Sequence, residues 1–91
     1  MYQIESASSR IKRELRRIPP PDRTRIAEAV QALADDPRPL GVVQLEPDVY
    51  RLRVGDYRVI YKVLDEERIV LIGRIVRRSE STYRDLRRLF E

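Results

Sequence analysis

The N-terminal third of the chain alternates briefly and then takes a helical period. Residues 2–5 alternate between apolar and polar side chains, as a short strand does. Ile11, Leu15 and Ile18 then recur at i, i+4 and i+7, which predicts one apolar face of a helix. Three prolines at positions 19–21 end this helix, because proline lacks an amide donor and clashes with the preceding turn.

A second helix is predicted directly after the prolines. Asp22 can cap it, and Asp35-Asp36-Pro37 closes it. Its buried stripe consists of Ile26, Ala29, Val30 and Leu33. The tight proline corner between the two helices favours an antiparallel helical hairpin.

Residues 37–48 follow neither period. They hold three of the six prolines together with Gly41, which predicts an irregular crossing segment. Leu40, Val43 and Leu45 are expected to attach this segment to the core.

From Val49 the apolar period changes to two, which predicts strands. Alternation runs over Val49–Val54, stops at Gly55-Asp56 and resumes over Tyr57–Leu64. Glycine at the first loop position suits a two-residue type II′ hairpin. After a turn at residues 65–68, residues 69–76 are apolar at almost every position, so we expect this strand to be central and covered on both faces.

Residues 80–90 complete the pattern as a helix with Tyr83, Leu86 and Phe90 on one face. The predicted order is β-α-α-β-β-β-α, in a single domain over residues 1–91. The expected fold is α+β: a small sheet dominated by antiparallel strands, an N-terminal helical hairpin and a C-terminal helix, with the helices over one side of the sheet.

Composition removes several kinds of chemistry. The chain has no His and no Cys, so zinc sites, disulfides and Cys–His or Ser–His nucleophile pairs are impossible. Its carboxylates show no metal-ligand spacing, and three glycines are too few for a loop that cradles phosphate. We therefore expect neither a metal nor a cofactor.

The net charge of +4 arises in the second half of the chain, where residues 50–91 hold 11 basic and 7 acidic side chains. Of the 19 basic residues 17 are Arg, the side chain best suited to bidentate phosphate binding, although a high-GC codon bias on a solvated surface explains the same composition. No apolar run approaches the ~20 residues of a membrane span, and the N-terminus has no signal-peptide core. A cytoplasmic location is expected.

The predicted hairpin sorts its side chains onto two faces. With Gly55-Asp56 as the loop, Arg53 lies directly opposite Arg58. The face that holds this pair, here called the basic face, carries Arg51, Arg53, Arg58 and Lys62. Like charges placed opposite each other destabilise a sheet, so an anion between them would explain the pair. Long side chains spread into water are the alternative.

The end of the last strand can add further cations to this face. Arg77-Arg78 follows the strand, and which of the two reaches the basic face depends on a register that a one-residue slip would invert. Tyr83 lies one turn into the last helix. Either it is a core aromatic with a solvated hydroxyl, or it stacks a base or transfers a proton beside the cations.

The segment Val49-Tyr-Arg-Leu-Arg-Val-Gly-Asp-Tyr-Arg-Val-Ile-Tyr61, followed by an apolar strand and Arg-Arg-Ser-Glu-Ser-Thr-Tyr83-Arg84, resembles the RelE/ParE toxin superfamily. The N-terminal strand, the helical hairpin and the proline-rich crossing segment fit the same superfamily. The resemblance therefore covers essentially the whole chain.

The resemblance implies the toxin component of a type II toxin–antitoxin system. A RelE-type toxin enters the ribosomal A site and cuts mRNA without a metal, by attack of the ribose 2′-OH on the adjacent phosphate. Its catalytic positions fall on Arg51, Arg53, Arg58, Arg78 and Tyr83, and further RNA-binding positions fall on Lys62, Arg77 and Arg84. Expected partners are mRNA, the ribosome and a RelB-like antitoxin that covers apolar grooves and the arginines.

Two departures from the family affect the mechanism. The best-known members have lysines at the first two catalytic positions, whereas Arg51 and Arg53 cannot act as bases at neutral pH. Related members use His or Glu, and this chain has no His. Tyr83 is left as the candidate base, with Glu80 a weaker one, and the arginines stabilise the phosphorane.

Two other functions stay open at this point. A ParE-like poison of DNA gyrase would share the fold without being a nuclease. A remnant of the toxin fold would only bind its partner or RNA.

Overall fold

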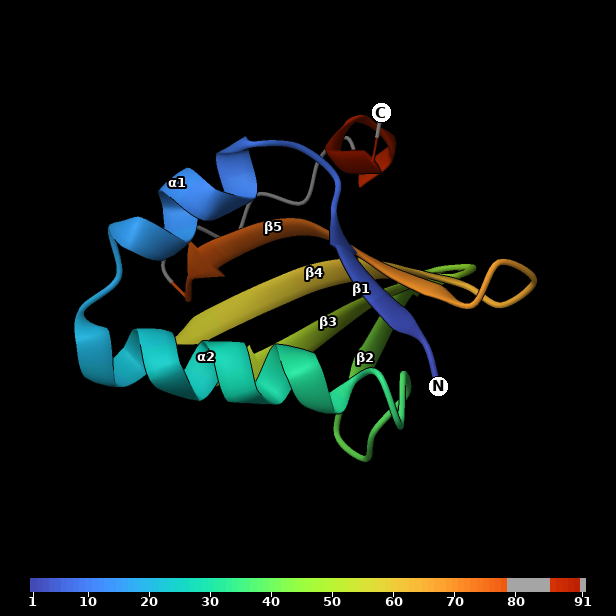
Figure 1. Ribbon diagram of the computed structural model, residues 1–91, viewed down its shortest axis with the longest axis horizontal. Helices are drawn as coiled ribbons and strands as arrows, with labels where there is room; N and C mark the ends of the chain where they lie inside the picture. The colour runs from blue at the N-terminus through green and yellow to red at the C-terminus, as the bar shows by residue number, and fades with distance from the viewer. Residues whose placement is uncertain (79–85, 91) are drawn as a thin grey trace.

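The computed structural model describes residues 1–78 and 86–90, apart from the side chain of Arg87. Its elements are β1 (Gln3–Ser6), α1 (Arg10–Arg16), α2 (Pro20–Ala32), β2 (Val43–Glu46), β3 (Val49–Val54), β4 (Tyr57–Leu64), β5 (Ile69–Arg77) and the 3-10 helix η1 (Leu86–Phe90). Within these residues the strands form one sheet in the order β1-β5-β4-β3-β2, with α1 and α2 across one face (Figure 1). The predicted α+β fold is confirmed.

The two N-terminal helices are joined by residues 17–19, and the chain reverses direction between them (Figure 1). α2 begins with two prolines, at positions where a missing amide costs nothing. Asp22 therefore lies inside the first turn, near the positive end of the helix dipole, and the prediction that it caps the helix is wrong. The Arg23 guanidinium donates to the carbonyls of Arg16 (3.3 Å) and Ile18 (3.1 Å), which satisfies acceptors at the end of α1.

The sheet is mainly antiparallel. β1 pairs with β5 in parallel, and the pairs β5–β4, β4–β3 and β3–β2 are antiparallel. The central strand is β4, not β5 as the sequence predicted. β5 nevertheless lies between two strands and packs against apolar groups on both faces, which accounts for its continuous apolar sequence.

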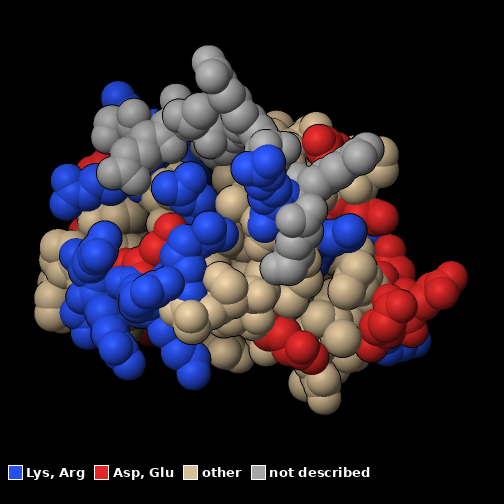
Figure 2. Space-filling view, turned by 90° about the horizontal axis from the view of Figure 1, so that it is seen from above, with Lys and Arg blue, Asp and Glu red and all other residues tan. Residues whose placement is uncertain are grey.

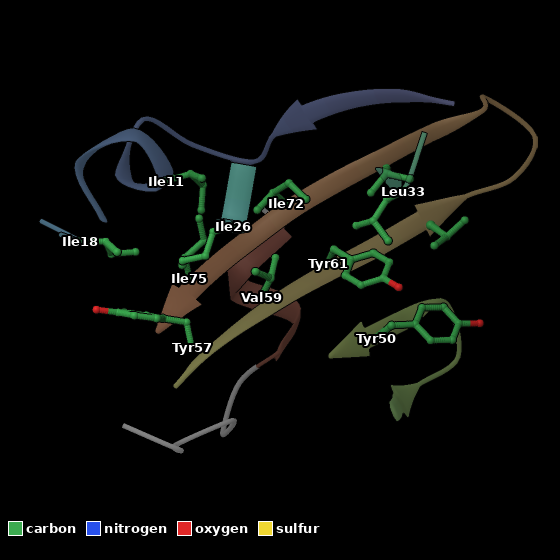
Figure 3. Packing of buried hydrophobic residues seen from close by; sticks show 12 residues of the cluster. Ile11, Ile18, Ile26, Leu33, Tyr50, Tyr57, Val59, Tyr61, Ile72 and Ile75 are labelled. Atoms are coloured by element: carbon green, nitrogen blue, oxygen red, sulfur yellow. The ribbon is translucent and has the colours of Figure 1, made fainter. Parts of the chain in front are cut away.

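The larger core fills the space between the sheet and the helices α1 and α2 (Figure 3). Its buried side chains are Ile11, Ile18, Ile26, Leu33, Tyr50, Tyr57, Val59, Tyr61, Val63, Val70, Ile72 and Ile75. On the opposite face η1 forms a second, smaller cluster, in which Leu86 packs with Val49 and Ile60. Helical elements therefore cover both faces, where the sequence predicted one. Of the predicted helix over residues 80–90, the described part, Leu86–Phe90, is a 3-10 helix.

The crossing segment contains a strand that the sequence did not predict. β2 pairs with β3 through a register shift near Leu45. Of the three predicted anchors, Leu40 and Val43 are exposed and only Leu45 packs against the core. Polar groups hold the segment as well: the fully buried Tyr61 donates its hydroxyl hydrogen to the carbonyl of Pro37 (2.7 Å).

A second set of polar contacts attaches the crossing segment to the turn between β4 and β5. The Arg38 guanidinium donates to the carboxylate of Asp65 at 2.7 and 3.2 Å and to the Tyr50 hydroxyl at 2.9 Å. The Tyr2 hydroxyl donates to the same carboxylate at 2.6 Å. These hydrogen bonds, that of Arg38 first, hold the pKa of Asp65 below its ordinary value.

Candidate nucleic-acid interface

The β3–β4 hairpin has the register that the sequence predicts. Arg53 pairs with Arg58 and Arg51 with Ile60 across the two strands. Gly55 has the positive φ, 57°, that the first position of a type II′ turn requires. The side chains of Arg51, Arg53, Arg58 and Lys62 therefore lie on one face of the sheet, opposite the face that carries α1 and α2.

Arg58 also contributes to the turn of its own hairpin. Its guanidinium donates to the carbonyls of Gly55 (3.1 Å) and Tyr57 (3.0 Å), so the side chain bends toward the hairpin tip. Arg53, directly opposite, is exposed. Of this opposed pair, Arg58 is therefore held by backbone carbonyls, whereas Arg53 is exposed to solvent.

A β-bulge in β5 determines which arginine at the strand end joins this face. Tyr61 pairs with Ile72 and Ile60 pairs with Arg74, so Gly73 is an extra residue in β5. Glycine fits this position because a Cβ would lie 2.6 Å from a ring carbon of Phe90 in η1. The extra residue inverts the alternation of every side chain that follows it.

After the bulge, Arg77 lies opposite Tyr57. Alternation then places the next residue, Arg78, on the side of the basic face. The Arg77 guanidinium carbon is 5.8 Å from the centroid of the Tyr57 ring, on the face that α1 and α2 cover. The Arg78 amide donates to the carbonyl of Asp56 at 2.7 Å and so extends the strand ladder by one residue. Without the bulge, alternation from Ile72 would have given the opposite assignment.

Of the remaining predicted site residues, the structure describes only Lys62. Tyr83, Arg84 and the weaker base candidate Glu80 are outside the residues that the structure describes. Their roles stay predictions. Lys62 is half-buried and pairs with Val49 and Leu71, farther along the basic face from the hairpin tip.

Sequence reasoning missed an acidic residue that closes the free edge of β5. Glu14 of α1 accepts a hydrogen bond from the Ile75 amide (2.9 Å) and one from the Arg74 guanidinium (3.4 Å). The strand edge beyond β1 is thereby covered by a side chain instead of a neighbouring strand. Arg74 is the single charged residue within the apolar run 69–76, a signal that could have revealed this contact.

Charge is distributed unevenly on the face of the molecule that Figure 2 shows. Basic side chains gather at the end that holds α1 and the C-terminal end of β5, and acidic side chains gather at the opposite end (Figure 2). The turn Asp65-Glu66-Glu67 between β4 and β5 is exposed at the acidic end. Among the described residues no group of three or more potential metal ligands occurs, and no helix there is long and apolar enough to cross a membrane.

Comparison with known proteins assigns the chain to a family. A family model described as the ParE toxin of the type II toxin–antitoxin system parDE matches residues 5–82. The chain belongs to this toxin family. The toxin is also 32% identical over 81 residues to the protein named "Putative toxin RelE1" of Methanocaldococcus jannaschii, which covers 84% of this chain and 89% of the relative. Membership of the RelE/ParE superfamily, expected from the sequence, is confirmed.

Solved structures agree on the fold of the toxin. The crystal structure of the archaeal RelE–RelB complex from Pyrococcus horikoshii matches with a TM-score of 0.75 and 25% identity, over 88% of this chain and 98% of that chain. The isolated Escherichia coli RelE toxin matches with a TM-score of 0.74 and 21% identity, over 85% and 84%. The toxin therefore has a RelE-like fold.

Proposed function

We propose that this toxin is a ribosome-dependent endoribonuclease that cuts mRNA in the A site and thereby inhibits translation. The observation that carries the proposal is the pairing of Arg53 with Arg58 on the basic face, with Arg78 following on the same side. Two like charges directly opposite each other cost stability, and a bound phosphate would offset that cost. The RelE-like fold and the similarity to the RelE1 sequence support the same function.

The proposed reaction needs only the RNA and side chains of the protein. The ribose 2′-oxygen loses its proton and attacks the adjacent phosphorus, and the new bond forms as the bond to the 5′-oxygen breaks. The departing 5′-oxygen takes up a proton, so the products are a 2′,3′-cyclic phosphate and a free 5′-hydroxyl. Negative charge grows on the phosphate oxygens in the transition state, and guanidinium groups can stabilise it with paired hydrogen bonds. Arg53, Arg58 and Arg78 have this role in the proposal, and Tyr83 that of the base.

We also propose a RelB-like antitoxin as the cognate partner. The similar toxin from Pyrococcus horikoshii was crystallised as a complex of RelE with RelB. An acidic segment of such an antitoxin would neutralise the basic face, and binding there would block access of RNA to the same arginines.

The test is a cleavage assay on programmed ribosomes, with cut positions mapped by primer extension and the same mRNA without ribosomes alongside. Wild-type toxin is expected to cut only in the A site. Removal of one group that stabilises the transition state lowers rates by about 100-fold or more, which is the loss expected for Arg53→Ala, Arg58→Ala and Arg78→Ala. The matched control is Arg13→Ala on the exposed side of α1. Full activity in all three variants would refute the assignment.

A gyrase poison is the second candidate, because the matching family model describes ParE toxins. It predicts intact mRNA on ribosomes and trapped breaks in a gyrase cleavage assay with supercoiled DNA. Run beside the ribosome assay, this measurement separates the two functions in a single protein preparation.

A further inference from the structure

A cleft of about 390 Å³ opens between α1 and the C-terminal end of β5, around the sheet edge from the basic face. Three arginines (Arg17, Arg74 and Arg77) and one carboxylate (Glu14) line it, together with Tyr57. We call it the α1–β5 cleft. Because its lining has more arginines than carboxylates, the cleft favours an anionic ligand.

The carboxylate in the cleft is already matched within the protein. Glu14 accepts from the Ile75 amide and pairs with Arg74, and its side chain is only 16% exposed. Arg17 and Arg77 have no carboxylate partner among the described residues. Two guanidinium groups therefore remain to bind an anion from outside.

Tyr57 adds a neutral donor to these two cations. The Tyr57 residue is 5% exposed, and its ring faces the Arg77 guanidinium. The hydroxyl points away from the rest of the core, on the side where Ile18 lies (Figure 3). A buried ring thus places a fixed hydroxyl in the wall of the cleft.

We propose that the α1–β5 cleft binds a phosphate of the same RNA strand that lies on the basic face. This proposal rests on the proposed function. Arg77 and Arg78 are consecutive, with Cα atoms ~3.8 Å apart, and they point to opposite sides of the strand end. A polymer with a phosphate at every unit can therefore contact the basic face through one of them and the cleft through the other.

Phosphate fits this donor set better than a carboxylate does. Arg17, Arg77 and Tyr57 offer two guanidinium forks and one hydroxyl. The two non-bridging oxygens of a phosphodiester are arranged tetrahedrally about phosphorus and can accept from donors on different sides, whereas the two oxygens of a carboxylate are coplanar and match a single guanidinium fork. An acidic segment of the antitoxin is therefore the competing occupant that the test has to distinguish.

The test measures binding of a single-stranded 2′-O-methyl RNA oligomer, which cannot be cut, to the full chain by fluorescence anisotropy at several salt concentrations. Each lost phosphate contact lowers the salt slope of log K by about 0.7 for single strands. Arg17→Ala and Arg77→Ala are each expected to show this decrease and a 3- to 10-fold weaker affinity, whatever the base sequence. Tyr57→Phe, which keeps the ring, should weaken binding about 2-fold. Arg13→Ala, at an exposed position of α1 one turn before Arg17, is the control.

Two results would overturn the proposal. In the first, Arg17→Ala and Arg77→Ala keep the affinity and salt slope of Arg13→Ala. In the second, the two cleft variants bind RNA as Arg13→Ala does, but a parallel titration with the antitoxin shows weaker binding. That result would assign the cleft to the protein partner. Because this assay needs no cleavage, it is independent of the ribosome assay. Weakened RNA binding in the cleft variants of a toxin that cuts nothing would refute the nuclease proposal and leave the cleft as a nucleic-acid site.

Discussion

Replacement of Arg53 by Glu should stabilise the toxin while removing its activity. Side chains directly opposite each other in an antiparallel pair have Cβ atoms about 5 Å apart, and opposite charges there contribute ~0.2–1 kcal/mol relative to an alanine pair. Arg53 faces Arg58, so the substitution turns a repulsive pair into an attractive one. Arg53 is exposed and Arg58 bends toward Gly55, and both facts reduce the effect. We expect a gain of about 0.5 kcal/mol in the free energy of unfolding.

Urea unfolding followed by circular dichroism, at low and high salt, measures this change. Arg53→Gln removes the positive charge without adding a negative one, has the same size as Arg53→Glu and should show roughly half of the gain. The gain for Arg53→Glu should shrink at 1 M salt, where the Debye length is only ~3 Å. Two results would refute the view that the two arginines repel each other. One is that Arg53→Glu is less stable than Arg53→Gln at low salt, and the other is that salt does not change the difference in stability between these two variants. In the ribosome assay Arg53→Glu should be inactive.

Three further predictions concern stability. Gly73→Ala should destabilise the protein by about 1–3 kcal/mol in urea unfolding, because its Cβ meets the Phe90 ring; an unchanged midpoint would show that η1 yields freely. Tyr61→Phe leaves a backbone carbonyl without its donor and should cost about 1 kcal/mol in the same assay, whereas no loss would mean that water replaces the hydroxyl. The pKa of Asp65 is lowered chiefly by Arg38, so stability should fall as the pH drops from about 4 through this lowered pKa. Asp65→Asn should flatten that part of a stability–pH curve, and an unchanged curve would contradict the pKa shift.

The elements that the sequence predicts correctly depend on neighbours in the chain. The register of the β3–β4 hairpin follows from alternation on either side of Gly55-Asp56, which acts over a few residues. The spacing of Ile11 and Ile18 in the first helix, and of Ile26 and Leu33 in the second, likewise predicts the helix faces that form the core. Local patterns of this kind require no knowledge of the rest of the fold.

The features that the sequence did not reveal depend on distant contacts. β2 forms because β3 offers an edge, although its own segment is rich in proline and glycine. The side on which Arg78 falls depends on a bulge at Gly73, which is favoured by the close approach of Phe90. Glu14 acquires its role only because the fold brings α1 to the free edge of β5. No window of adjacent residues contains this information.

The separation of charge along the molecule affects how the toxin meets a polyanion. With cations around α1 and the end of β5, and anions on the β4–β5 turn, the face seen in Figure 2 carries an electric dipole along the length of the molecule. A polyanion such as RNA exerts a torque on this dipole, which turns the arginine end forward and the acidic turn away. Screening limits the torque to approaches within ~8 Å at physiological salt, so it acts in the last step before contact. A larger fraction of collisions then begins in a productive orientation, which raises the association rate without any added contact in the complex.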